Sequence, residues 1–229
     1  MLLDPKGKTL AVSWWFLRHN CSVTSEWLSR ALEESRARGF LGPQPIEPQI
    51  IHAEGFAKCW EALHETPPAR LLDLGSGGGL PGLVLVERWG SPGVFLDSMI
   101  KRNKFLSETL LWTGAPTNCE VVTARAEEAA RWPEMDDQFD LVAARSFGPP
   151  AVTAECAVRF LKVGGALIVS EPPADRTEER WNPSGLGILG LKAQGRSRYG
   201  AGYEVLLKVR PTEKQFPRPV GIPKKKPLF

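Results

Sequence analysis

Residues 71–82 read LLDLGSGGGLPG and hold most of the information about the fold of this chain. An apolar run typical of a buried strand leads into glycines, and an apolar helical pattern begins directly after them. Glycine lets backbone N–H groups approach a ligand closely, and open α/β folds bind ligands at the carboxyl ends of their strands. Residues 77–82 also satisfy the G-x-G-x-x-G pattern of dinucleotide-binding loops. The loop therefore predicts a cofactor site without selecting the cofactor.

Short apolar runs alternate with amphipathic stretches from residue 69 onward. The runs predict five strands, at Arg70–Leu74, Gly93–Asp97, Glu120–Thr123, Phe139–Ala144 and Ala166–Ser170. Helical patterns lie between them, at Leu80–Arg88, Ile100–Trp112, Ala126–Arg131 and Ala151–Leu161. This alternation is typical of βαβ crossovers and predicts an α/β fold with a doubly wound, mostly parallel sheet. Two later segments, Leu191–Arg198 and Tyr203–Arg210, are expected to add an antiparallel pair.

Two helices are expected ahead of the glycine loop. Ser25 can cap a helix that begins at Glu26, and a second helix is expected from about Gln49 to His64. The linker Gly42–Pro48 contains three prolines and is expected to be non-helical. The chain is therefore divided into an N-terminal helical extension (1–66), a cofactor-binding domain (67–210) and a basic Pro/Lys-rich C-terminal tail (211–229). The tail is expected to be extended.

The composition is that of a globular protein, with 42% hydrophobic and 24% charged residues. The net charge of +3 hides an asymmetry, because residues 192–229 carry ten Lys or Arg against two Glu. A basic end of this kind suggests an anionic partner, although a solvated tail without a partner explains it equally well. No apolar run approaches the roughly 20 residues that span a bilayer. The longest, Thr9–Leu17, is interpreted as a helix and not as a secretion signal.

The cysteines and histidines indicate neither a metal site nor a redox motif. Cys21, Cys59, Cys119 and Cys156 lie far apart and form no C-x-x-C pair. The three histidines also lack the spacing of metal ligands. We therefore expect no metal and predict reduced thiols in a cytoplasmic protein.

Two carboxylates near the glycine loop bear on the choice between S-adenosylmethionine and a nicotinamide dinucleotide. Asp73 lies inside the first predicted strand, where the ammonium and sulfonium of S-adenosylmethionine would need nearby negative charge. Asp97 ends the second predicted strand, where a carboxylate can accept both ribose hydroxyls of either cofactor. Asp73 is therefore the residue that favours S-adenosylmethionine over a nicotinamide dinucleotide.

Taken together, the motifs resemble class I methyltransferases and, within them, the RsmG (GidB) family. The resemblance covers about Ile51 to the C-terminus. It rests on the G-L-P-G of the glycine loop, L-D-S-x-x-K-R-x-x-F-L at 96–106, A-R-S-F at 144–147 and R-P-x-G-I-P-K-K-K-P-L at 218–228. It implies S-adenosylmethionine as the cofactor and N7 of a guanine in 16S rRNA as the methyl acceptor. The implied partner is 16S rRNA or the small ribosomal subunit.

The resemblance also implies roles for single residues. Gly75 and Leu80 would line the methionine and sulfonium part of the cofactor, while Asp97 and Ser98 would hold its ribose. Ala126 and Glu127 would hold its adenine. The expected cofactor-binding residues are Asp73, Gly75, Gly77, Gly79, Leu80, Asp97, Ser98, Ala126, Glu127 and Arg145.

Charged residues supply the expected catalytic and RNA-binding groups. Arg145 follows a predicted strand and is hard to place in an apolar core, so it is expected to be the catalytic residue, on the cofactor or on the target. The expected RNA-binding residues are Arg218, Lys224, Lys225 and Lys226.

The residues present agree with guanine N7 chemistry, because N7 carries an in-plane lone pair and attacks without losing a proton. Alignment and electrostatics then suffice. Cys156, on an apolar helical face, is interpreted as a core residue and not as a nucleophile. Departures from the family, such as Glu54-Gly55 after His52 where the family has Asp-Ser, leave two alternatives open. These are a methyltransferase for a small molecule or protein, and a nucleic-acid-binding module without turnover.

Overall fold

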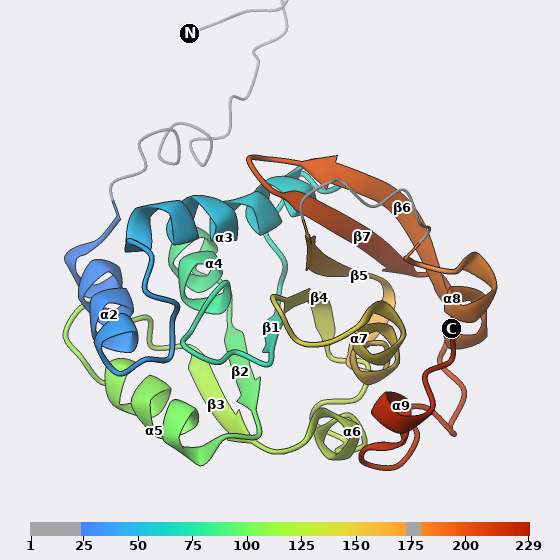
Figure 1. Ribbon diagram of the computed structural model, residues 1–229. Coiled ribbons are helices and arrows are strands. Elements are labelled where there is room, and N and C mark those ends of the chain that lie inside the picture. The colour runs from blue at the N-terminus through green and yellow to red at the C-terminus, as the bar shows by residue number, and fades with distance from the viewer. Residues whose placement is uncertain (1–23, 173–179) are drawn as a thin grey trace, which may run out of the picture.

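A seven-stranded sheet organises the chain in the computed structural model, which describes residues 24–172 and 180–229 (Figure 1). The strands are β1 (Leu71–Leu74), β2 (Gly93–Asp97), β3 (Cys119–Thr123), β4 (Phe139–Ala144), β5 (Leu161–Glu171), β6 (Leu191–Arg198) and β7 (Gly202–Lys208). Their order is β3-β2-β1-β4-β5-β7-β6, and the five strands from β3 to β5 are parallel. β7 runs antiparallel to both β5 and β6. The predicted fold class, including the antiparallel C-terminal pair, is confirmed.

Helices cover both faces of the sheet (Figure 1). One face carries α2 (Glu26–Ala37), α3 (Ile46–Glu61), α4 (Gly82–Trp89) and α5 (Ile100–Thr109). The other carries α6 (Ala126–Ala129), α7 (Pro150–Ala157) and α8 (Pro183–Leu189), and the short α9 (Ile222–Lys225) packs beside α7. Successive strand residues serve opposite faces, as strand geometry requires: Leu71 belongs to the first core and Leu72 to the second.

The N-terminal helices share the first core with the sheet. Ser25 caps α2 as expected, because its hydroxyl accepts the Leu28 N–H at 3.1 Å. The expected start of the next helix is wrong, since α3 begins at Ile46 and takes in Pro48. Proline is compatible with the first helical turn, where the backbone N–H has no intrahelical partner. The helix can therefore begin within the proline-containing linker, with Pro48 in its first turn and the other two prolines before it.

Two C-terminal expectations are also wrong. β5 begins at Leu161, five residues before the predicted strand, and a register shift between its pairings with Phe139 and Leu141 accommodates the extra residues. The last residues are not an extended tail. Phe216 is buried, α9 forms, and the ring of Phe229 packs directly on the backbone of Gly185.

Residues 1–23, with the predicted helix at Thr9–Leu17 and Cys21, lie outside the described part of the chain. Within the described part, no helix is long and apolar enough to cross a bilayer. Residues 24–172 and 180–229 also contain no group of three or more His, Cys, Asp or Glu side chains placed to hold a metal ion.

The topology places the ligand site. From β1 the chain moves outward to β2 and β3, and it then returns to form β4 and β5 on the other side of β1. The strand order therefore reverses between β1 and β4, and ligands of open α/β sheets bind at the carboxyl ends of the strands beside such a reversal.

Candidate active site

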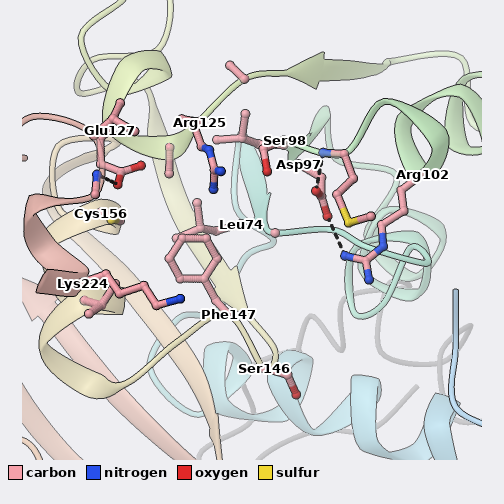
Figure 2. Close-up of a pocket in the computed structure, with 18 residues that line it drawn as sticks. Leu74, Asp97, Ser98, Arg102, Arg125, Glu127, Ser146, Phe147, Cys156 and Lys224 are labelled. Atoms are coloured by element: carbon pink, nitrogen blue, oxygen red, sulfur yellow. Dashed lines mark hydrogen bonds and ion pairs between the residues drawn. The ribbon is translucent and has the colours of Figure 1, made fainter.

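A cavity of about 450 Å³ opens at this carboxyl edge (Figure 2). Its walls come from residues that follow β1, β2, β3 and β4, and from the C-terminal segment. Predicted site residues that end or follow β1, β2 and β3, or that belong to the C-terminal segment, line it: Gly75, Asp97, Ser98, Ala126, Glu127 and Lys224. The fold thus brings together residues that are up to 149 positions apart in the sequence.

Asp97 is the most firmly anchored group in the cavity. It ends β2 and is only 7% exposed. One carboxylate oxygen accepts the Gly77 N–H at 3.0 Å, and the other accepts the Met99 N–H at 2.8 Å. The Arg102 guanidinium lies 3.4 Å away, as the dashed lines in Figure 2 indicate. The carboxylate is therefore fixed in orientation and retains lone pairs for hydroxyl groups of a ligand.

The glycine loop is held against the end of β2. The N–H groups of Gly75 and Ser76 donate to the Leu96 carbonyl at 2.8 and 3.1 Å. Gly75 has a φ of +73°, and a Cβ there would lie 2.7 Å from the ring of Phe147. Only glycine meets both requirements without strain, so the backbone forms the cavity wall directly.

Asp73 lies beneath the loop and is completely buried. Its Oδ2 accepts the Gly82 N–H at 2.9 Å, whereas its Oδ1 has no hydrogen-bond partner among the described residues. Burial raises the pKa of Asp73 to about 7, and the Gly82 N–H and the Arg145 guanidinium oppose this shift. A cationic ligand above the loop would favour the ionised form.

Arg145 lines a second, adjoining cavity of about 230 Å³, which shares Gly75 with the first. Its Nη2 donates to Gln49 Oε1 at 3.3 Å, and its buried Nη1 has no partner in the described part. Burial lowers the pKa of Arg145, and the carboxylate of Asp73 opposes that effect. The buried Nη1 of Arg145 is thus an unpartnered donor in the second cavity, whereas the unpartnered acceptor of Asp73 lies close to Arg145 but lines neither cavity. An amino-acid moiety carries the matching carboxylate and ammonium.

The N-terminal helices build part of this second cavity. Gln49 comes from α3, and residues 40–42 between α2 and α3 form another part of the wall. The hydroxyl of Ser35 on α2 donates to the Gly78 carbonyl at 2.8 Å, which ties α2 to the glycine loop. Residues 40–42 and Gln49, which were assigned to the N-terminal extension, therefore line the second cavity.

The remaining predicted loop residues take different positions. Gly77 and Leu80 line the second cavity. Gly79 lines neither cavity and serves the turn, because its φ is +100° and a Cβ would meet Leu83 at 2.5 Å.

The four predicted RNA-binding residues lie in different surroundings. Lys224 reaches the first cavity, and Lys225 and Lys226 are exposed. Arg218 instead pairs with Glu155, a completely buried carboxylate of α7, at 2.6 Å. A role for these four residues in RNA binding stays a prediction.

Two cations in the site were not predicted as site residues. Arg125 lines the first cavity, and Figure 2 shows its guanidinium and the Lys224 ammonium extending from different walls toward Phe147. Arg102 lines both cavities and contacts Asp97. Arg102 belongs to the L-D-S-x-x-K-R motif, five positions after Asp97, and this motif was the available signal.

Comparisons with known proteins agree with this architecture. The family model GidB, rRNA small subunit methyltransferase G, matches residues 48–184. Relatives called ribosomal RNA small subunit methyltransferase G include one from Fervidobacterium nodosum, 30% identical over 69% of this chain and 76% of the relative. Another, from Desulfitobacterium hafniense, is 32% identical over 80% of this chain and 79% of the relative.

Solved structures show the same fold. Cofactor-bound Rv0187 from MTB superposes with a TM-score of 0.59 at 18% identity, over 85% of this chain and 95% of that one. A SAM dependent methyltransferase from Aquifex aeolicus superposes with a TM-score of 0.55 at 16% identity, over 78% and 98%.

Proposed function

The chain belongs to the GidB family of rRNA small subunit methyltransferases G, and from this membership we propose that it methylates N7 of a guanine in 16S rRNA. S-adenosylmethionine is the methyl donor. The observation that carries the proposal is Asp97, a buried carboxylate fixed by two backbone N–H groups at the sheet's topological switch. We further propose that the protein works in the cytoplasm on 16S rRNA or the small ribosomal subunit.

The site residues fit the cofactor at both ends. Asp97 and Ser98 would hold the ribose, and Ala126 and Glu127 the adenine. Gly75, Gly77 and Leu80 would contact the methionine part, with Gly79 setting the turn, Asp73 supplying negative charge and Arg145 a guanidinium. When bound, S-adenosylmethionine supplies an electrophilic methyl group. The three parts of the chain, 1–66, 67–210 and 211–229, would then all contribute to one site.

The surrounding side chains suit an acceptor that needs no base. Burial raises the pKa of the Cys156 thiol far above its usual value, so this cysteine does not supply a thiolate nucleophile. N7 of guanine attacks with its own lone pair, and the enzyme then has to align the base and exclude water. Phe147, which lines the cavity, can stack on a base that leaves its helix.

The direct test is nucleoside mass mapping of 16S rRNA from cells with and without the gene, followed by methylation of purified small subunits by the recombinant protein. We expect one 7-methylguanosine to disappear with the gene and to return in vitro. An unchanged rRNA map with a protein that binds the cofactor would favour a small-molecule or protein acceptor. Cofactor binding without any transfer would favour a non-catalytic binding module.

Cofactor affinity is expected to rise with pH through the titration of Asp73. The pKa of Asp73 is about 7 in the free protein, so below pH 7 the carboxyl is protonated and loses its attraction for the cationic cofactor. Calorimetry should find that S-adenosylmethionine binds about four times more tightly at pH 8 than at pH 6.5, because the ionised fraction of Asp73 rises by about this factor. An Asp73→Asn variant should lose this part of the dependence. Its amide still accepts the Gly82 N–H, and the cofactor's own titration affects both proteins equally. Parallel pH profiles for the two proteins would contradict the assignment.

Arg125 and Lys224 are expected to contact RNA phosphates. Neither side chain makes a hydrogen bond or ion pair within the described residues, and a cationic cofactor gains nothing from two added cations. An Arg125→Ala/Lys224→Ala variant should show a salt dependence of RNA binding that is shallower by roughly 0.7–0.9 per lost contact.

The matched control for this pair is Lys162→Ala/Lys192→Ala, which removes the same charge elsewhere. Lys162 pairs with Asp140, and Lys192 is exposed on β6. If both double variants change the salt slope equally, only net charge matters, and the two pocket cations are not phosphate contacts.

A further inference from the structure

The C-terminal residues fold back over α6 and α7 and are held there mainly by side chains (Figure 1). Arg131 donates to the carbonyls of Gln215 and Pro217, at 3.2 and 2.6 Å. Within residues 219–226 the backbone hydrogen bonds are local, such as Lys225 N–H to the Gly221 carbonyl at 3.0 Å. The segment joins no strand, and its position between the buried Phe216 and the Phe229 ring, which packs on Gly185, depends on side-chain contacts with the body of the protein.

Arg218 makes the densest of these contacts. Its Nε donates to Glu155 Oε1 at 2.8 Å and its Nη2 to Glu155 Oε2 at 2.6 Å, which is a bidentate fork. The Arg218 backbone N–H also donates to Oε1 at 2.8 Å. The same Nη2 reaches forward to the Lys226 carbonyl at 2.7 Å and so closes residues 218–226 into a loop. Because Glu155 is completely buried, it strongly requires this partner.

The loop closed by Arg218 forms a wall of the candidate cofactor cavity. Val220, Gly221 and Lys224 line the cavity opposite Asp97 and Ser98. The Gly221 N–H donates to Glu127 Oε1 at 3.0 Å, and Glu127 is the residue expected beside the adenine. The loop is thus fixed at one end on Glu155 and in its middle on Glu127.

We propose that Arg218 is a positioning residue for the cofactor site: by clamping Glu155, it holds residues 220–224 in place as the wall on the adenine side. This inference rests on the proposed position of the cofactor in the cavity. It replaces the expected role of Arg218 in RNA binding, because Nε and Nη2 of the guanidinium both donate to protein acceptors. Loss of the fork leaves a buried carboxylate without its charge partner, and the loop can then move away from the cavity.

The experiment compares the parent protein with full-length Arg218→Ala and Arg218→Lys variants. Calorimetry with S-adenosylhomocysteine gives the dissociation constant, and thermal melting without ligand gives the stability. We expect Arg218→Ala to weaken binding at least about fivefold. Arg218→Lys should recover part of the loss, because lysine keeps the charge and gives up the fork.

The matched control is Arg88→Ala. Arg88 forks onto Glu61 at 2.8 and 3.0 Å, at the end of α4 remote from the glycine loop. The two arginine side chains are similarly exposed, at 19% and 23%, whereas Glu61 is 22% exposed and Glu155 is completely buried. Arg88→Ala should lower the melting temperature by less than Arg218→Ala, because Glu61 keeps contact with water, and it should leave the dissociation constant within twofold. Equal losses of cofactor affinity in both alanine variants would overturn the proposal, and so would unchanged binding by a folded Arg218→Ala protein. If Arg218→Ala does not fold, Arg218→Lys takes its place: unchanged cofactor binding, or a loss equal to that of Arg88→Ala, would overturn the proposal.

RNA binding supplies a further readout that separates the two roles of Arg218. The Arg218 substitutions are compared in a Lys224→Ala/Lys225→Ala/Lys226→Ala background, because movement of the loop would also move these three lysines. In that background a positioning residue should leave the salt slope of RNA binding unchanged when cofactor is absent. If the salt slope of RNA binding becomes shallower by the amount expected for about one phosphate contact while cofactor binding stays intact, Arg218 contacts RNA and does not position the cofactor site. Failure of the parent chain itself to bind S-adenosylhomocysteine would refute the proposed function and is thus distinguishable from failure of this inference.

Discussion

An Asp97→Ala variant is expected to bind S-adenosylmethionine about 10 to 150 times more weakly than the parent chain. Hydrogen bonds to a charged group contribute roughly 1.5–3 kcal/mol, and each 1.4 kcal/mol changes a dissociation constant tenfold. The substitution removes the proposed acceptor of the ribose hydroxyls. It also releases the N–H groups of Gly77 and Met99, so the glycine loop loses one of its attachments to β2 and keeps those of Gly75 and Ser76 on the Leu96 carbonyl. Calorimetry with the purified variant measures the effect.

Asp140→Ala controls for the loss of an anchored carboxylate. Asp140 also accepts a backbone N–H, that of Arg70 at 2.9 Å, and pairs with a cation, Lys162 at 2.9 Å. It stands near the start of β4, at the opposite edge of the sheet from the cavity. The control should lose stability without losing cofactor affinity. A folded Asp97→Ala protein that binds the cofactor within twofold of the parent would show that the cavity is not the cofactor site.

The inner strands could be predicted because the sheet is covered on both faces. Every residue of β1 and β2 is buried, and such strands appear in the sequence as continuous apolar runs between turn signals. The predicted bounds of β2 and β4 are those of the structure. The helices between them followed from the crossover that parallel strands require.

Tertiary contacts determine the segments that the sequence did not predict. The C-terminal residues look polar and proline-rich, yet their fold depends on Glu155, which is 63 positions away from Arg218. One signal was available, since Glu155 stands alone among small and apolar residues of α7 and a buried carboxylate needs a partner. The sequence could not say which arginine supplies it.

The site residues show the same difference between positions that follow strand ends and positions that only tertiary contacts determine. Residues adjacent to strand ends, such as Gly75, Asp97 and Arg145, could be placed at one edge because parallel strands share their carboxyl side. Gln49 could not be placed, because it approaches Arg145 from a helix 96 residues earlier. Arg125 was not predicted, although it directly precedes Ala126, just after the third predicted strand.

Arg145 is the point where cofactor and target would meet. Its guanidinium has one edge on Gln49 and a buried Nη1 without a partner in the described residues, beside the fully buried Asp73. A purely structural arginine in this environment would form a direct ion pair. None involving Arg145 occurs within 24–172 and 180–229. The free donor is therefore suited to a ligand, either the cofactor carboxylate or a guanine edge.

Arg145→Lys is accordingly expected to keep the fold and to lose activity. The charge remains, so the melting temperature should stay within a few degrees, which corresponds to less than about 1 kcal/mol. Lysine cannot reproduce the fork, and the rate of methylation of small subunits should fall by at least roughly tenfold, or about 1.4 kcal/mol in the barrier. Single-turnover rates at saturating cofactor measure this. Arg88→Lys, which alters a comparable arginine fork on Glu61, should leave the rate unchanged. An Arg145→Lys protein that melts early but methylates normally once folded would make Arg145 a structural residue, and target recognition would then have to come from Phe147 and the two pocket cations.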